Sequence, residues 1–329
     1  MDILNKISKV RVLQHTGLKN VIVGVTQIRN KTVPVESAFR VHGPRPTSAS
    51  VPIFVLHDCL GSKANWEHIC QRITMSTNMT VIAVDARNHG DSPEASSHGY
   101  YDLAEDITYL LNSLNIDKGI FIGHSMGGRT AMLYALTEPT KVASLVVVDI
   151  SPASIPNCLA EFYPKAVDVL SSVEFNDMDL DKAKLAARKE ILDSGLFQSE
   201  IDLQLILMNI ARMKNNYIGW KYNLDALKSN MSKILSFPTV PEKQYYGPAL
   251  FLAGQLSYAL KPDDMPGIHR LFPNAHLFYV QGAGHNAEAS GAKRDGADHT
   301  EAETGRSEYS GGRAEYSRAR TGQSGAEQQ

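Results

Sequence analysis

A serine, a histidine and two carboxylates occur at places in this 329-residue sequence where they could together cleave an acyl bond. Ser125 lies in "FIGHSMGGR", with a glycine two positions before it and another two positions after it. An apolar run leads into this stretch and a helical pattern leaves it, which is typical of a sharp strand-to-helix turn that exposes a serine hydroxyl. The pattern predicts that Ser125 is a nucleophile, and the alternative is a glycine-rich packing turn.

A serine hydroxyl needs a base that removes its proton, and the base needs an acid that orients it. His285 follows the last apolar run, in "GAGH", where glycines allow a loop to fold back over the edge of a sheet. We predict that His285 is the base rather than a solvated loop residue. The order serine, acid, histidine along the chain is the order expected for such a turn.

The acid has two candidates. Asp149 ends the apolar run that follows the nucleophile helix, so it should emerge at the same sheet edge as Ser125. It could instead cap the "SPAS" turn that follows it. Asp225, in "GWKYNLDALK", is the alternative acid, although it starts a helical pattern and could simply cap that helix. The loop 255–258, a usual place for the acid, holds no carboxylate.

An acyl-transfer site also needs backbone N–H groups that stabilise the developing oxyanion. We predict that these donors are the N–H of Met126, directly after the nucleophile, and the N–H of Cys59 in "LHDCLGS". The Cys59 thiol has no evident base and is not expected to be a second nucleophile. The three cysteines show no metal-ligand spacing, and neither a metal nor another cofactor is expected.

The elements that must position these residues alternate along the chain. Helical patterns separate six apolar runs, which are residues 51–57, 80–86, 119–124, 142–150, 247–254 and 276–281. Unbroken apolar strands between helices are typical of a parallel sheet covered on both faces.

Residues 153–235 interrupt this alternation. They lose strand character and are predicted to form three or four helices, including "SEIDLQLILMNIARM". A helical insertion in such a sheet usually forms a lid over the substrate site. We therefore predict a mostly parallel α/β core at 51–152 and 236–285, a helical lid at 153–235, and a basic segment with the first strands at 1–50.

Four stretches give the chain a resemblance to a known family. "VDARNHGDSP", "GHSMGGR", "VVVDISPAS" and "NLDALKSNMSKILSFP" resemble the α/β-hydrolases, in particular the group of alpha/beta-hydrolase domain-containing protein 11 and its bacterial esterase relatives. The resemblance implies the α/β-hydrolase fold, a serine esterase or lipase that acts on ester and acylglycerol substrates and, in animals, a mitochondrial location. The acid of the bacterial relatives matches Asp149, whereas some members have theirs at the position of Asp225.

The chain departs from this family at two places. The motif after the first core strand begins His-Gly in the family and His57-Asp58 here. A carboxylate close to the oxyanion would cost on the order of 1 to 4 kcal/mol of transition-state stabilisation.

The second departure follows His285, where the family continues with an aromatic residue and a final amphipathic helix. Residues 286–329 contain no Leu, Ile, Val, Met, Phe or Trp, and this composition predicts a disordered tail. We expect a bare sheet face that a protein partner could cover. A weakly active or non-catalytic binding protein is therefore the alternative function.

Composition narrows the range of partners. The formal charge of −2 gives no indication of nucleic-acid binding, and no apolar run approaches the ~18 residues of a membrane helix. Residues 1–50 hold eight lysines and arginines against Asp2 and Glu36, which is typical of an organelle-targeting segment but also of a charged first strand. The expected partner is a small-molecule or lipid ester, and the expected location is the mitochondrion, with the cytoplasm as the alternative.

Overall fold

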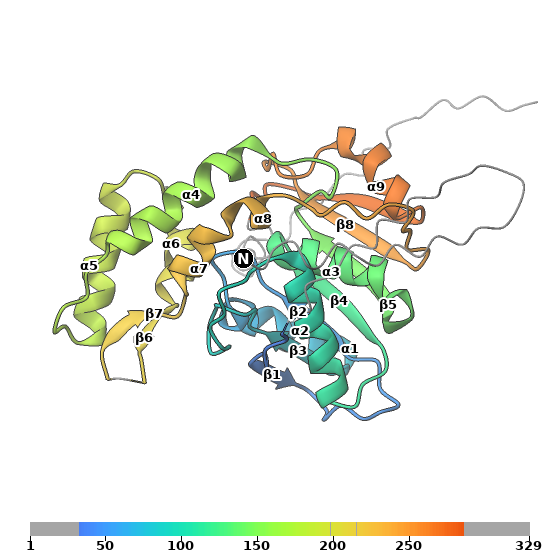
Figure 1. Cartoon of the computed structure of the whole chain (residues 1–329), viewed down its shortest axis with the longest axis horizontal. Coiled ribbons are helices and arrows are strands. Elements are labelled where there is room, and N and C mark those ends of the chain that lie inside the picture. The colour runs from blue at the N-terminus through green and yellow to red at the C-terminus, as the bar shows by residue number, and fades with distance from the viewer. Residues whose placement is uncertain (1–32, 198, 215, 286–329) are drawn as a thin grey trace, which may run out of the picture. The chain divides into compact units, whose positions relative to one another are not determined.

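The computed structural model describes residues 33–197, 199–214 and 216–285, which are built around a seven-stranded sheet (Figure 1). The strand order is β1-β3-β2-β4-β5-β8-β9. Neighbouring strands are parallel except for β1 (Phe39–His42), which pairs antiparallel with β3. The predicted tail at 286–329 and most of the basic segment, residues 1–32, lie outside the described residues.

The six remaining strands of the sheet lie at the six predicted apolar runs. They are β2 (Ile53–Leu56), β3 (Val81–Val84), β4 (Gly119–His124), β5 (Val142–Val148), β8 (Ala249–Gly254) and β9 (Ala275–Val280). Every residue of β2 and β3 is buried, as strands covered on both faces require. The predicted mostly parallel α/β class is confirmed.

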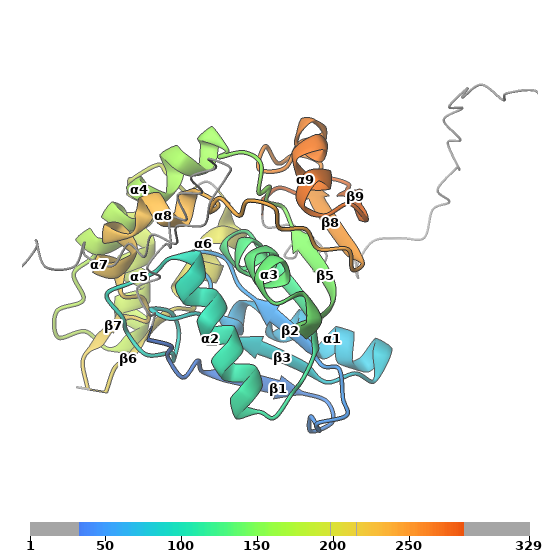
Figure 2. The same ribbon diagram turned by 45° about the vertical axis from the view of Figure 1, so that its right-hand side comes forward.

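Helices cover both faces of this sheet (Figure 2). Since successive side chains of a strand point to opposite faces, β2 contributes to two apolar clusters. Phe54 and Leu56 belong to the cluster of α2 (Tyr100–Ser113) and α3 (Met126–Thr137). Ile53 and Val55 belong to the smaller cluster on the side of α1 (Glu67–Thr77), which the short helix η2 (Lys63–Trp66) precedes.

The segment between β5 and β8 forms a helical layer with a small two-stranded sheet. Its elements are α4 (Asn157–Ser172), α5 (Leu180–Asp193), α6 (Glu200–Leu207), β6 (Ile210–Arg212), β7 (Ile218–Trp220), α7 (Leu224–Ser229) and α8 (Met231–Leu235). The short η3 (Pro139–Lys141), η4 (Pro262–Asp264) and α9 (Met265–Leu271) complete the core. No helix in the described part of the chain is both long and apolar enough to span a membrane.

The prediction of helices alone for 153–235 was wrong at one place. The predicted helix "SEIDLQLILMNIARM" ends at Leu207, and its last residues form β6, which pairs antiparallel with β7. Ile210, Ile218 and Trp220 favour strands because branched and aromatic side chains pack well on a pleated surface. Asn216, which lies between them, has a φ of 66°, and its N–H donates to the carbonyl of Met213 at 2.9 Å, as in a turn.

Candidate active site

Ser125 lies on a tight turn between β4 and α3. Its φ of 49° and ψ of −113° are backbone angles that non-glycine residues rarely adopt. A Cβ at Gly123 would lie 2.3 Å from the carbonyl oxygen of Gly127, and a Cβ at Gly127 would lie 2.2 Å from that of Leu56. Neither distance leaves room for a side chain, so the two glycines are what allow this turn to form.

The turn brings Ser125 to His285 and Asp149. Ser125 Oγ lies 3.2 Å from His285 Nε2, and His285 Nδ1 lies 2.8 Å from Asp149 Oδ2. A carboxylate only accepts hydrogen bonds, so Nδ1 carries the ring proton and Nε2 can accept from the serine hydroxyl. The three residues follow β4, β5 and β9, whose carboxyl ends meet at one edge of the sheet. This is the arrangement of a nucleophile, its base and an orienting acid.

The carboxylate of Asp149 is fully buried and held by two further donors. The backbone N–H of Gly254 donates to Oδ1 at 2.9 Å, and the hydroxyl of Ser257 donates to Oδ2. Ser257 was not predicted from the sequence. It lies in the loop 255–258, where the acid of such a site is often found. This loop has no carboxylate, and its Ser257 hydroxyl instead holds the carboxylate of Asp149, which follows the neighbouring strand β5.

Asp225, the alternative acid, lies in a different setting. It is exposed in the first turn of α7. The residue that caps this helix is Asn223, whose side chain accepts from the backbone N–H of Ala226 at 3.1 Å. The side chain that pairs with His285 is therefore that of Asp149, and Asp225 is placed to interact favourably with the helix dipole.

Cys59 and Met126, the predicted oxyanion donors, lie close to Ser125. All three line one small buried cavity, together with Tyr163 of α4. Burial, followed by the nearby charge of Asp58, raises the pKa of the Cys59 thiol. The thiol is therefore protonated at neutral pH, and only the backbone of Cys59 is available for chemistry.

A cavity of about 300 Å³ opens beside His285 and Ser257. Its apolar wall comes from the helical layer and includes Phe162, Phe197 and Ile206. A mostly apolar pocket with a few convergent polar groups is typical of a small-molecule binding site. The helical layer therefore supplies a wall of the cavity beside His285, and its role as a lid stays a prediction.

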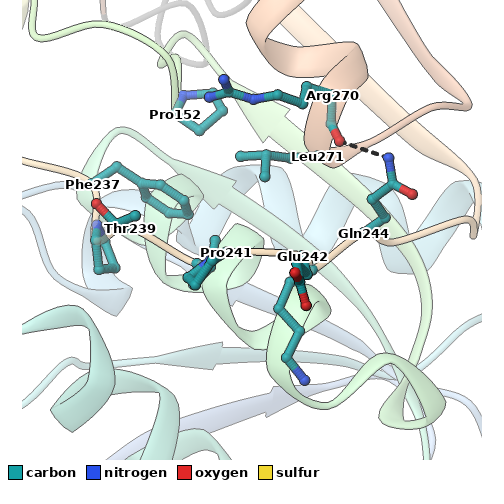
Figure 3. Close-up of a pocket in the computed structure, with 11 residues that line it drawn as sticks. Pro152, Phe237, Thr239, Pro241, Glu242, Gln244, Arg270 and Leu271 are labelled. Carbon is teal, nitrogen blue, oxygen red and sulfur yellow. Dashed lines mark hydrogen bonds between the residues drawn. The ribbon is translucent and has the colours of Figure 1, made fainter. Parts of the chain in front are cut away.

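A larger cavity of about 710 Å³ lies elsewhere, between the segment 237–244 and the end of α9 (Figure 3). Gln244 Nε2 donates to the backbone carbonyl of Arg270 at 2.9 Å across this space. Neither Ser125 nor any residue paired with it lines this cavity. Its size alone does not make it a site for chemistry.

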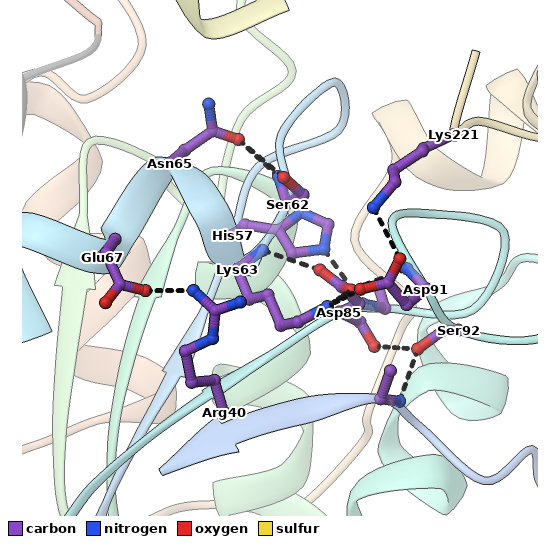
Figure 4. Close-up of polar contacts among 12 residues, drawn as sticks. Arg40, His57, Ser62, Lys63, Asn65, Glu67, Asp85, Asp91, Ser92 and Lys221 are labelled. Carbon is purple, nitrogen blue, oxygen red and sulfur yellow. Dashed lines mark hydrogen bonds and ion pairs between the residues drawn. The ribbon is translucent and has the colours of Figure 1, made fainter. Parts of the chain in front are cut away.

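Ion pairs join the predicted oxyanion loop to the loop after β3 (Figure 4). The Lys63 ammonium donates to Asp85 and, at 2.6 Å, to Asp91, while the backbone N–H of Lys63 donates to Asp85 at 2.7 Å. Lys221, which follows β7, pairs with Asp91 at 2.6 Å. These ion pairs connect the loop that carries Cys59 to both the core and the helical layer. No sequence pattern predicted them.

In the described part of the chain, no group of three or more His, Cys, Asp or Glu side chains could hold a metal ion.

Comparison with known proteins decides the family, because the model of the alpha/beta hydrolase fold matches residues 51–289. The chain belongs to the α/β-hydrolase fold family. It is 34% identical over 278 residues to the sn-1-specific diacylglycerol lipase ABHD11 of Danio rerio, with 82% of this chain and 85% of that protein covered. The Mus musculus protein of the same name is 37% identical over 242 residues, covering 72% and 76%.

Solved structures agree with this assignment. A marine microorganism esterase, 32% identical, superposes with a TM-score of 0.70 over 79% of this chain and 96% of its own. The E-2-(acetamidomethylene)succinate hydrolase, 22% identical with a TM-score of 0.62, shares the fold. The resemblance inferred from the four sequence stretches is confirmed.

Proposed function

We propose that this protein is a carboxylic ester hydrolase that cleaves acylglycerols or other lipid esters through an acyl-enzyme on Ser125. The observation that carries this proposal is the hydrogen-bonded series Ser125–His285–Asp149 beside a mostly apolar cavity. Relatives named as a diacylglycerol lipase and an esterase support the same reaction class.

The reaction begins when Ser125 Oγ attacks the ester carbonyl and His285 Nε2 takes the hydroxyl proton. The backbone N–H groups of Met126 and Cys59 donate to the oxyanion of the tetrahedral intermediate. His285 then gives its proton to the departing alcohol, and the acyl group remains on Ser125. Asp149 holds the imidazole in the required tautomer and stabilises its charged form.

The second half of the reaction regenerates the serine. Water attacks the acyl-enzyme while His285 accepts a proton from the water. As the second tetrahedral intermediate collapses, the bond between the acyl carbon and Ser125 Oγ breaks, His285 returns the proton to Oγ, and the carboxylic acid is released. The apolar wall formed by Phe162, Phe197 and Ile206 suits an acyl chain, because each buried CH₂ contributes ~0.8 kcal/mol.

The test of this proposal is Ser125→Ala in the full-length protein, compared with Ser232→Ala, which changes an exposed serine of α8. We expect Ser125→Ala to abolish both hydrolysis of 4-nitrophenyl butyrate and labelling by an uncharged fluorophosphonate, while Ser232→Ala retains both. Residual turnover above ~1% of the wild type in Ser125→Ala would contradict the assignment, because loss of a triad member usually costs far more. A wild-type protein that neither hydrolyses nor labels would support the non-catalytic alternative.

A further inference from the structure

The cavity beside His285 carries negative charge on its polar wall. Two carboxylates line it, Asp58 from the core and Asp202 from α6. No lysine or arginine is among the described residues that line it. The proposed reaction does not use the carboxylate of Asp58, so the place of Asp58 in the wall needs another explanation.

Asp58 lies near the proposed base His285. It directly precedes Cys59 and lines the same cavity as His285. Its Oδ1 lies 4.0 Å from Nδ1 of the buried His124, whose ring centre is 4.9 Å from that of His285. About 20% of the Asp58 side chain is exposed, so its charge is only partly hydrated.

The backbone of Asp58 is fixed independently of its carboxylate. Its carbonyl oxygen accepts from His57 Nδ1 at 2.7 Å and from the N–H of Gly61 at 3.2 Å. Its φ is not positive, so the residue is under no strain that would favour glycine. The loop therefore does not depend on the side chain of Asp58 to keep its conformation.

The charge of Asp58 reaches the other groups around the cavity. Burial raises the pKa of the Tyr163 and Tyr222 hydroxyls, and the Asp58 carboxylate raises them further. Tyr163 lines the cavity, and Tyr222 donates to the carbonyl of Leu60 in the loop that carries Asp58. The field of this carboxylate thus acts on the space that a substrate would occupy.

We propose that Asp58 selects substrates by charge, so that uncharged and cationic esters react and esters with an anionic group near the scissile bond are rejected. This inference rests on the proposed ester hydrolase function. One unit charge several ångströms from another in a partly hydrated site changes an equilibrium by on the order of tenfold. Uncharged acylglycerols would be hydrolysed, whereas anionic monoesters of dicarboxylic acids would be rejected.

The test uses three 4-nitrophenyl esters of similar length: the uncharged butyrate, the anionic hemiglutarate and the cationic 4-(trimethylammonio)butyrate. The full-length wild type, Asp58→Asn and Asp263→Asn are compared by kcat/KM. Asp58→Asn removes the charge and keeps the size of the side chain. Asp263→Asn is the matched control, because Asp263 is exposed and does not line the cavity.

We expect the wild type to prefer the uncharged and cationic esters, and Asp58→Asn to raise the ratio of anionic to uncharged kcat/KM about tenfold. Asp263→Asn should leave this ratio within twofold of the wild type. The inference fails if the wild type prefers the hemiglutarate, or if Asp58→Asn does not change the ratio while the butyrate is still hydrolysed. The proposed function fails instead, and this inference with it, if the wild type hydrolyses none of the three esters and no fluorophosphonate label is incorporated.

Discussion

Asp149 is the residue on which the orientation of His285 depends. Its buried carboxylate accepts from the imidazole, from the N–H of Gly254 and from the hydroxyl of Ser257. Three hydrogen bonds fix the direction in which this carboxylate points. The imidazole is thereby held in the tautomer that leaves Nε2 facing Ser125.

Asp149→Asn should therefore lower turnover of 4-nitrophenyl butyrate by about 10³- to 10⁴-fold, because an amide can donate to Nδ1 and favour the wrong tautomer. Asp225→Asn should change turnover less than threefold, since Asp225 is exposed at the start of α7. Steady-state kinetics at equal folded fraction, verified by circular dichroism, would decide between them. If Asp225→Asn were nearly inactive and Asp149→Asn retained activity, the acid would be Asp225 of α7 instead.

A substitution of Ser257 tests whether the hydrogen bonds that hold the carboxylate of Asp149 contribute to turnover. Ser257→Ala removes one of the two further donors to Asp149, and we expect turnover to fall by about tenfold, far less than for Asp149→Asn. Ser236→Ala is a suitable control, because its hydroxyl only donates to the Ser232 carbonyl within its own helix region. A Ser257→Ala variant with wild-type kcat would show that Gly254 and His285 suffice to hold the carboxylate.

These residues differ in how far the sequence reveals them. Ser125 and His285 could be predicted because each follows an apolar run and has glycines close to it in the sequence. Asp149 could not be separated from Asp225 by sequence, since either carboxylate could cap a following turn or helix. Ser257 could not be found at all, because its partner lies 108 positions away and a serine in a loop has no distinctive pattern. Contacts between distant segments depend on the folded sheet.

At the scale of elements, ion pairs hold the loops around the site together. Partial burial opposes ionisation of Asp91, but hydrogen bonds from Lys221 and Lys63 lower its pKa to about 2. Since this pKa lies below the ordinary aspartate value of 3.8, the charge of Asp91 stabilises the folded state fully above about pH 4. This stabilisation is lost as the pH falls through about 2.

Asp91→Asn should accordingly lower Tm most at pH 5 to 7, and the difference from the wild type should fall to about half by pH 3. Scanning calorimetry from pH 3 to pH 7 measures it. Asp168→Asn, which breaks the exposed pair with Lys228, should have little effect at any pH, because surface ion pairs contribute little. A difference in Tm between wild type and Asp91→Asn that is the same at pH 3 and pH 6 would contradict this account.

The elements themselves were predicted well where burial dictates them. Six strands follow apolar runs. In β2 and β3 every residue is buried, because a strand covered on both faces favours apolar residues at successive positions, whereas β9 lies at the sheet edge and is partly exposed. The pair β6 and β7 was missed because each strand has only three residues. The residues of β6 fit the helical pattern that precedes them, so the sequence did not reveal a strand. The segment forms a strand because it pairs with β7 across a turn.

At the scale of the whole described structure, the two faces of the sheet are covered unequally. The cluster that contains α2 and α3 extends into the helical layer, whereas the cluster on the side of α1 is smaller. On that second side, Val146, Leu252 and Val280 are only partly buried. Phe278, two positions before Val280 on the edge strand β9, is 61% exposed. The protein partner expected for this face stays a prediction.

Phe278 should make the protein associate with itself. It pairs in register with Leu252 and points to the same face as Val280. An apolar patch therefore lies next to a strand edge that no strand of the described residues pairs with. Exposed patches of this kind favour association.

We expect Phe278→Ser to lower concentration-dependent light scattering with little loss of Tm, because so exposed a side chain contributes little burial. Met75→Ser, which changes an 84% exposed side chain of α1, is the control and should leave the scattering unchanged. Scattering that does not fall in Phe278→Ser, or that falls equally in both variants, would show that this face of the sheet does not drive association.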